Sequence, residues 1–347
     1  MVKAFICGCA GPRLDRGEVE FLAREQPFGL ILFKRNCREP DEIRHLTAAF
    51  RDAVDRPDAP VFVDQEGGRV QRLQPPQWPS YPPARTIGLL AEVDPEAGQR
   101  AAWLHGRLIA ADLRDVGIDV NCMPVLDVIA EGASEAIGDR SFSPGAHMVA
   151  MLGRSVADGL LAGGVLPVMK HTPGQGRATA DSHAVLPRID ASVADLAVSD
   201  FVPFAELADL PIAMTGHVVL AAVDPRNAAT VSRAVIRDII RQRIGFDGLL
   251  VSDDVSMHAL SGDYASRASC IHDAGVDLVL HCNGRTEEMR RIGETAPALV
   301  GKPRERALRA LHMRKDPAPF DRQAAREEFL AQLARVNWPP ASVGALS

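Results

Sequence analysis

The stretch VLPVMKH, residues 165–171, decides the fold class. Its first five residues are apolar at consecutive positions, which is typical of a parallel strand that is buried on both faces. The run then ends on two polar residues, Lys170 and His171. A buried strand that closes on polar side chains indicates an α/β fold whose strand ends carry functional groups.

The same pattern occurs seven more times along the chain. The other apolar runs are AFICGC (4–9), GLILF (29–33), PVFVDQ (60–65), IDVNCMPVLDV (118–128), PIAMTGHV (211–218), GLLVSDD (248–254) and VDLVLHCN (276–283). Stretches with apolar residues at helical spacing lie between them, at 41–54, 96–117, 148–164 and 232–245. Eight alternations of strand and helix predict a (β/α)8 TIM barrel. A doubly wound sheet is the alternative, but it would usually have fewer strands and a glycine-rich phosphate loop, of which CGCAGPR is a poor version.

The chain is predicted to form a single domain with a C-terminal helix. Residues 1–316 would form the (β/α)8 barrel, and residues 317–347 would be a C-terminal helix and tail packed on it. Within that last segment, 321–338 has the spacing of one amphipathic helix. The proline-rich segment 74–86 is interpreted as an ordered loop over one end of the barrel, because the barrel pattern continues after it.

Composition and charge narrow the function classes. The 347 residues are 46% hydrophobic and 24% charged, with a net charge of −6, so a general nucleic-acid partner is not expected. The sequence has neither a signal-peptide pattern nor an apolar run of membrane-spanning length, so we expect no membrane partner and a cytoplasmic location. We expect a monomer or weak dimer. The six cysteines form no Cys-x-x-Cys pair, which favours buried free thiols over a zinc or redox site.

Polar residues cluster at the ends of the predicted strands. They are Asp64, Asn121, Asp127, Lys170, His171, His217, Asp253, Asp254, His281 and Asn283. Each has an ordinary structural interpretation, such as a helix cap or a satisfied buried histidine. The presence of polar residues at the ends of six of the eight strands is better explained by a polar pocket at the carboxyl ends of the barrel strands.

The segment KHTPGQGRATADSH, residues 170–183, resembles a motif of the family 3 glycoside hydrolases. The motif is Lys-His-Phe-Pro-Gly-His-Gly, a short loop, and Asp-Ser-His. More narrowly, the chain is similar to the single-domain bacterial β-N-acetylglucosaminidases of the NagZ type. Further stretches that agree in order and spacing are GLILFKRN (29–36), VDQEGGRVQRL (63–73), DVNCMPVLDV (119–128), IGDRSFS (137–143), MTGHV (214–218) and VSDDVSM (251–257).

The resemblance implies a role for each matching residue. Asp253 would be the catalytic nucleophile, with its neighbour Asp254 as the alternative. His183 would be the general acid/base and Asp181 its partner. The residues that would bind hydroxyls of the terminal sugar are Asp64, Arg72, Arg140, Lys170 and His171. A retaining glycosidase needs a carboxylate and a proton donor, and a neighbouring carboxylate favours the protonated form of a histidine.

Three loop residues depart from the family pattern. Thr172 stands where the motif has Phe, Gln175 where it has the second His, and Arg177 near the usual Asp. The resemblance implies that this loop is mobile, and Gly174 and Gly176 are compatible with unusual backbone angles. The departures leave loop conformation and subsite preference open.

The resemblance predicts hydrolysis of a terminal β-linked N-acetylglucosamine by double displacement, with peptidoglycan fragments as substrate and no cofactor or metal. A β-glucosidase or a β-glycoside phosphorylase of the same family stays open, because a histidine acid/base does not repel phosphate as a carboxylate would. A catalytically silent sugar-binding barrel is the non-enzyme alternative. A zinc hydrolase using His171, His183, His217 and Asp253 would need a ligand spacing that matches no common zinc motif.

Overall fold

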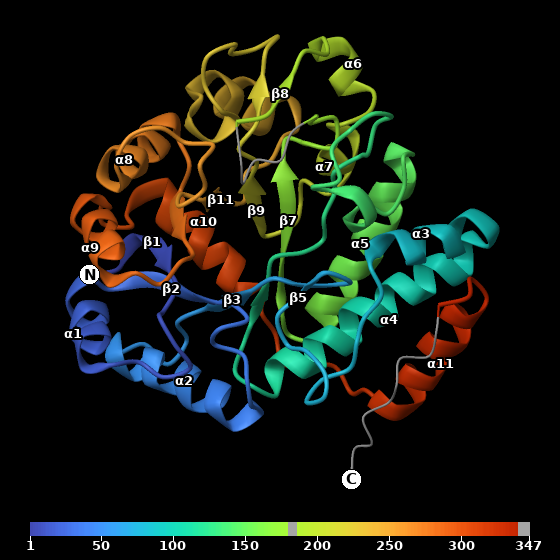
Figure 1. Cartoon of the computed structure of the whole chain (residues 1–347), viewed down its shortest axis with the longest axis horizontal. Helices are drawn as coiled ribbons and strands as arrows, with labels where there is room; N and C mark the ends of the chain where they lie inside the picture. The colour runs from blue at the N-terminus through green and yellow to red at the C-terminus, as the bar shows by residue number, and fades with distance from the viewer. Residues whose placement is uncertain (180–185, 339–347) are drawn as a thin grey trace.

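A closed barrel of eight parallel strands forms the centre of the computed structural model, which describes residues 1–179 and 186–338 (Figure 1). The barrel strands are β1 (Lys3–Cys7), β2 (Pro27–Leu32), β3 (Val61–Val63), β6 (Val120–Asn121), β7 (Leu166–Thr172), β9 (Ile212–Thr215), β11 (Leu249–Asp254) and β12 (Leu278–His281). They follow one another around the barrel in chain order, and β12 pairs with β1 to close it. The eight apolar runs of the sequence supply these strands, so the predicted (β/α)8 barrel is confirmed.

Helices surround the barrel. They are α1 (Arg16–Glu25), α2 (Pro40–Ala53), α3 (Ala84–Val93), α4 (Pro95–Arg114), α5 (Ala146–Ala162), α6 (Val193–Ala197), α7 (Val202–Glu206), α8 (Tyr264–Ala274), α9 (Thr286–Thr295), α10 (Gly301–His312) and α11 (Arg322–Ala334). Two 3-10 turns cover Gly138–Arg140 and Ala229–Val231, and Val235–Arg243 has π-helical spacing. Two short pairs complete the fold: the hairpin β4 (Gln65–Gly67) with β5 (Val70–Gln71), and β8 (Arg188–Ile189) with β10 (Val219–Leu220).

Alternation along the strands separates two cores. One cluster fills the barrel interior and includes Leu166 and Val168 of β7, whereas Met169 belongs to the cluster between strands and helices. Because successive side chains of a strand point to opposite faces, Lys170 follows Leu166 and Val168 toward the interior. β7 therefore delivers Lys170, its last inward residue, to the mouth of the barrel.

The C-terminal helix packs against the barrel's outer layer. In Figure 1, α11 lies along α4. Asp112 of α4 is buried, pairs with Arg322 of α11, and accepts a 2.6 Å hydrogen bond from the Tyr81 hydroxyl. Tyr81 belongs to the proline-rich loop, so a single carboxylate joins that loop to the last helix. The domain boundary at residue 316 stays a prediction.

The six cysteines are free thiols, and Cys7, Cys9, Cys37, Cys122 and Cys282 are buried as predicted. Cys270 is exposed, so the prediction of a buried thiol is wrong at that position. Within residues 1–179 and 186–338, no helix combines the length and the apolar character needed to cross a bilayer.

Candidate active site

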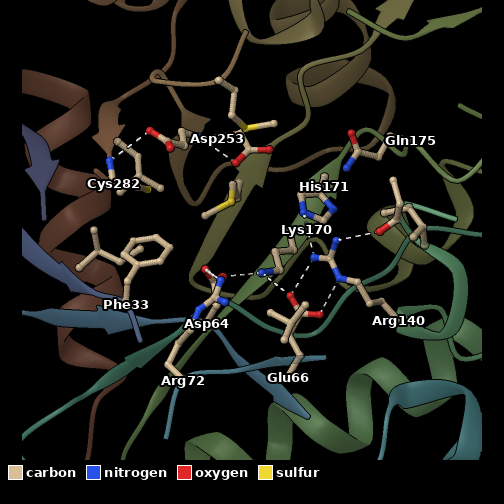
Figure 2. A pocket seen from close by; sticks show the side chains of 18 of the residues that line it. Phe33, Asp64, Glu66, Arg72, Arg140, Lys170, His171, Gln175, Asp253 and Cys282 are labelled. Carbon is tan, nitrogen blue, oxygen red and sulfur yellow. Dashed lines mark hydrogen bonds and ion pairs between the residues drawn. The ribbon is translucent and has the colours of Figure 1, made fainter. Parts of the chain in front are cut away.

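A cavity of about 280 Å³ opens at the carboxyl ends of the barrel strands (Figure 2). Six of the predicted site residues line it: Asp64, Arg72, Arg140, Lys170, His171 and Asp253. They come from four separate parts of the chain, the β3–β5 segment, the turn at 138–140, β7 and β11. The structure therefore brings these residues together at one place, while the roles implied for them stay predictions.

Lys170 lies between two carboxylates on the floor of the cavity. Its Nζ is 2.7 Å from Oδ1 of Asp64 and 2.7 Å from Oε1 of Glu66. Burial alone would lower the pKa of this buried lysine, but Asp64 and Glu66 hold it above its usual value. Lys170 is therefore a cation that two carboxylates fix on the floor of the cavity.

Asp64 is held as an anion by two cations. Besides Lys170, Arg72 donates from Nη2 to Oδ2 of Asp64 at 3.1 Å. Burial would raise the pKa of Asp64, but Lys170 and Arg72 hold it below its usual range. The guanidinium of Arg72 also lies 5.1 Å from the ring centre of Phe33, which fixes it from the other side.

Glu66 is a site residue that the sequence interpretation missed. Arg140 donates to both of its carboxylate oxygens at 2.8 Å, in a bidentate pair. Burial would raise the pKa of Glu66, but Arg140 and Lys170 lower it to about 2. Its place in DQEGGRVQR, two residues after Asp64 in a stretch already singled out, was the available signal.

Asp127 orients His171 from behind the cavity wall. Its Oδ2 is 2.7 Å from Nδ1 of His171, and its Oδ1 accepts the backbone N–H of Gln175 at 2.8 Å. A carboxylate at Nδ1 makes that nitrogen the donor, so Nε2 faces the cavity side, 3.5 Å from Nη2 of Arg140. Asp127 therefore fixes the orientation of the His171 ring and the position of the Gln175 backbone.

Asp253 and Asp254 have different surroundings. Asp253 follows Leu249 and Val251 of the interior cluster, and its Oδ1 accepts the backbone N–H of Asp254 at 2.8 Å. The carboxylate of Asp254 accepts the backbone N–H groups of Ser256 and Cys282 at 2.9 and 3.1 Å, and also the Ser256 hydroxyl. The second oxygen of Asp253 accepts no hydrogen bond from the described residues, so it is the free oxygen of the pair.

The other polar strand ends brace the site instead of lining it. Asn121 bonds both backbone groups of Gln65, at 3.0 and 2.9 Å. His217 is fully buried between the Thr230 hydroxyl at 2.8 Å and the Asp254 carbonyl at 3.0 Å. Burial lowers the pKa of His217 against the opposing effect of Asp253, so it serves as a neutral donor to that carbonyl.

On the far side of β12, His281 and Asn283 both bond to Glu288. Burial lowers the pKa of His281, although Asp254 and Glu288 act in the opposite direction. The expectation that every polar strand end lines one mouth is therefore wrong for these groups, because their hydrogen bonds are satisfied within the protein wall.

The loop after β7 is packed up to residue 179. A Cβ at Gly176 would lie 2.0 Å from the Val128 carbonyl oxygen, so this glycine permits a close backbone approach. Arg177 turns outward, where it pairs with Asp200 at 2.7 Å and donates to Ser199 at 2.9 Å. Asp181 and His183 lie outside the described residues, and their acid/base roles stay predictions.

The arrangement can bind and polarise a neutral, hydroxyl-rich ligand. Four cationic side chains and four carboxylates line the cavity, so it offers both donors and acceptors of hydrogen bonds. Within the described part of the chain, no three His, Cys, Asp or Glu side chains gather as metal ligands would. A carboxylate with one free oxygen at the end of such a pocket is the group that covalent glycoside cleavage requires.

Comparisons with known proteins agree with this geometry. Residues 2–306 match the family model described as the glycosyl hydrolase family 3 N-terminal domain. A β-hexosaminidase from Methylococcus capsulatus is 41% identical over 277 residues, which cover 79% of this chain and 80% of the relative. A β-hexosaminidase from Chromobacterium violaceum is 36% identical over 332 residues, covering 94% and 92%.

A solved structure extends the match to the fold. The crystal structure of NagZ from Neisseria gonorrhoeae in complex with N-trifluoroacetyl-D-glucosamine superposes with a TM-score of 0.83 at 31% identity, covering 96% of this chain and 97% of that one. The resemblance of the Lys170–His183 segment is thereby confirmed at the level of the family. The chain belongs to glycosyl hydrolase family 3, within its β-hexosaminidase branch.

Proposed function

We propose that this protein is a retaining β-N-acetylhexosaminidase that removes a terminal β-linked N-acetylglucosamine through a covalent glycosyl-Asp253 intermediate. The observation that carries the proposal is the Asp253 carboxylate, which lines the cavity with one oxygen held by the Asp254 N–H and the other without a donor among the described residues. A nucleophile needs this combination of fixed orientation and an available lone pair.

The reaction has two balanced steps. In the first, an Asp253 oxygen bonds to the anomeric carbon as the glycosidic C–O bond breaks, and His183 gives its proton to the leaving oxygen. In the second, a water oxygen bonds to the same carbon, His183 takes the water proton, and the bond to Asp253 breaks. Asp181 would favour the protonated form of His183 in the first step.

Sugar binding is assigned to the ion-pair cluster. Asp64 and Glu66 are anionic acceptors, and Lys170, Arg72 and Arg140 are cationic donors, so each can hydrogen-bond a hydroxyl more strongly than a neutral group would. These groups already hold one another before a sugar enters, which reduces the ordering cost of binding. We propose peptidoglycan fragments that end in N-acetylglucosamine as the natural substrates, on the strength of the NagZ likeness.

The test compares an aryl β-N-acetylglucosaminide with an aryl β-glucoside, each with and without inorganic phosphate. We expect hydrolysis of the first to exceed that of the second, with no change in turnover on adding phosphate. A 2-fluoro or 5-fluoro sugar should label one peptide, and mass spectrometry should place the label on Asp253.

Each alternative has its own result. Faster turnover with phosphate and a sugar phosphate as product would mean a phosphorylase, and a preference for the glucoside would mean a β-glucosidase. Sugar binding without turnover would mean a silent binding protein. A label on Asp254 would move the nucleophile by one residue and would overturn the assignment to Asp253.

A further inference from the structure

We infer that the Gln175 carboxamide is a specificity-determining group that hydrogen-bonds the acetamido substituent at C2 of the sugar. The inference rests on the proposed function, because the Asp253 nucleophile sets which sugar atoms lie near Gln175. Gln175 is one of three residues that depart from the family motif, where a histidine is usual.

The Gln175 carboxamide is polar, buried and unused. The residue is 7% exposed and lines the cavity. Its Oε1 is buried and has no hydrogen-bond partner among the residues that the structure describes. A buried acceptor without a partner is unfavourable, and a ligand that supplies the donor removes this cost. Figure 2 shows the carboxamide turned toward the cavity, beyond His171.

The backbone around Gln175 is fixed, so the carboxamide has a defined reach. Its N–H donates to Asp127, the same carboxylate that holds His171. A Cβ on Gly216 would lie 3.2 Å from Oε1 of Gln175, so the glycine leaves the amide its space. Gln175 and His171 are therefore positioned as a unit against one end of the bound sugar.

The position of Gln175 selects the substituent that it can reach. In Figure 2 it lies on the same side of the cavity as Asp253, while Asp64 and Arg72 lie on the opposite side. In the sugar, C2 is bonded to the anomeric carbon. A sugar held with its anomeric carbon at Asp253 therefore carries its C2 substituent on the Asp253 side of the cavity, where Gln175 lies.

The chemistry of a carboxamide suits an acetamido group. It carries two N–H donors and one carbonyl acceptor without charge, and an acetamido group carries one N–H and one carbonyl. A hydroxyl at C2 is shorter and has no carbonyl to accept from Nε2. The neutral amide also keeps these hydrogen bonds unchanged over the pH range in which a histidine would titrate.

The test uses Gln175→Met, which keeps the length of the side chain and removes its donor and acceptor. Thr172→Val is the matched control, because the Thr172 hydroxyl is also buried with no hydrogen-bond partner among the described residues, but Thr172 does not line the cavity. Wild type and both variants are assayed for kcat/KM on the aryl β-N-acetylglucosaminide and the aryl β-glucoside. Inhibition by free N-acetylglucosamine and by glucose is measured beside them.

We expect Gln175→Met to lower kcat/KM on the N-acetylglucosaminide by about tenfold and to weaken inhibition by N-acetylglucosamine, with less than about a twofold change for the glucose compounds. Thr172→Val should leave the ratio of the two substrates unchanged. An equal loss on both substrates, or an unchanged ratio in Gln175→Met, would overturn the inference. Failure of the wild type to cleave the N-acetylglucosaminide would instead overturn the proposed function.

Discussion

Asp253 and Asp254 are neighbours in β11, yet among the described residues only Asp254 has donors to both carboxylate oxygens. Its oxygens accept from the Ser256 N–H, the Ser256 hydroxyl and the Cys282 N–H, whereas the one described donor to the Asp253 carboxylate is the Asp254 N–H. Asp254 connects the end of β11 to the residue that follows β12, and Asp253 has a carboxylate oxygen available for reaction. Two adjacent residues therefore differ in role: Asp254 is structural, and Asp253 is the proposed nucleophile.

Exchanging each aspartate for asparagine should separate these two roles. Asp253→Asn should lower kcat on the aryl β-N-acetylglucosaminide at least about a thousandfold, because an amide is a poor nucleophile, while the melting temperature changes little. Asp254→Asn should lower the melting temperature by several degrees and kcat by a smaller factor, because an amide accepts fewer of these hydrogen bonds. A nearly active Asp253→Asn beside an inactive Asp254→Asn would contradict the assignment.

Removing the cation between Asp64 and Glu66 should strongly destabilise the fold. Lys170→Met leaves two buried carboxylates next to each other, and breaking a buried ion pair from one side typically costs about 3–5 kcal/mol. The double variant Lys170→Met/Glu66→Gln also lacks one of the two negative charges. Its loss of unfolding free energy should therefore be about 1–3 kcal/mol smaller than the sum of the losses in the two single variants. Urea unfolding of the four proteins measures this coupling. Strictly additive losses would mean that Lys170 and Glu66 do not interact.

His105 should make stability depend on pH in a definite window. It is buried, its Nε2 donates to the Glu66 carbonyl at 2.8 Å, and burial lowers its pKa from 6.5 to about 4. Between these values the unfolded chain binds more protons than the folded one. The free energy of unfolding should therefore fall as the pH drops from 6.5 to about 4, by up to roughly 3 kcal/mol, and this contribution should be constant below pH 4.

His105→Gln is the comparison for that window, because the amide can still donate to the Glu66 carbonyl but does not titrate. The pKa values of His217, His272 and His281 are also lowered, and these residues are present in both proteins. The difference between the two pH profiles, measured by urea unfolding from pH 7 to pH 4, isolates His105. Parallel profiles would show that His105 is not kept neutral by the fold.

The contact between the proline-rich loop and α4 should be worth a measurable part of the stability. Tyr81→Phe removes the hydroxyl that donates to Asp112, and hydrogen bonds to charged groups contribute about 1.5–3 kcal/mol. Tyr264, the other tyrosine of the chain, is only partly buried, so Tyr264→Phe is the control and should cost less. Equal losses of unfolding free energy in the two variants would contradict a special role for the Tyr81–Asp112 bond.

The barrel strands were predictable because a strand buried on both faces is apolar at consecutive positions. VLPVMKH became β7, and GLLVSDD became β11. The helices at 41–54, 96–117 and 148–164 became α2, α4 and α5 because their apolar residues repeat at helical spacing. The segment 232–245 is helical over Val235–Arg243, but its π spacing has no signature in the pattern of apolar residues.

The bracing contacts were not predictable from one sequence. Glu66 lies in QEGGRVQR, which has the composition of a loop and gives no sign of the β4–β5 hairpin. Its partner Arg140 is 74 residues away, and His171 is 44 residues from Asp127. The sequence pattern identifies which strands end in polar residues. Which of these residues line the cavity and which hold its wall in place depends on distances across the barrel.

The bond from Tyr81 through Asp112 to Arg322 also bears on how this chain could be shortened. A designer who cuts after the last barrel strand and its helices would discard Arg322 and leave Asp112 facing solvent with one tyrosine hydroxyl. Tyr81 of the proline-rich loop would then no longer be connected through Asp112 to Arg322 of α11. The partner that Arg322 provides for the buried Asp112 is therefore a reason to retain the final helix in a shortened chain.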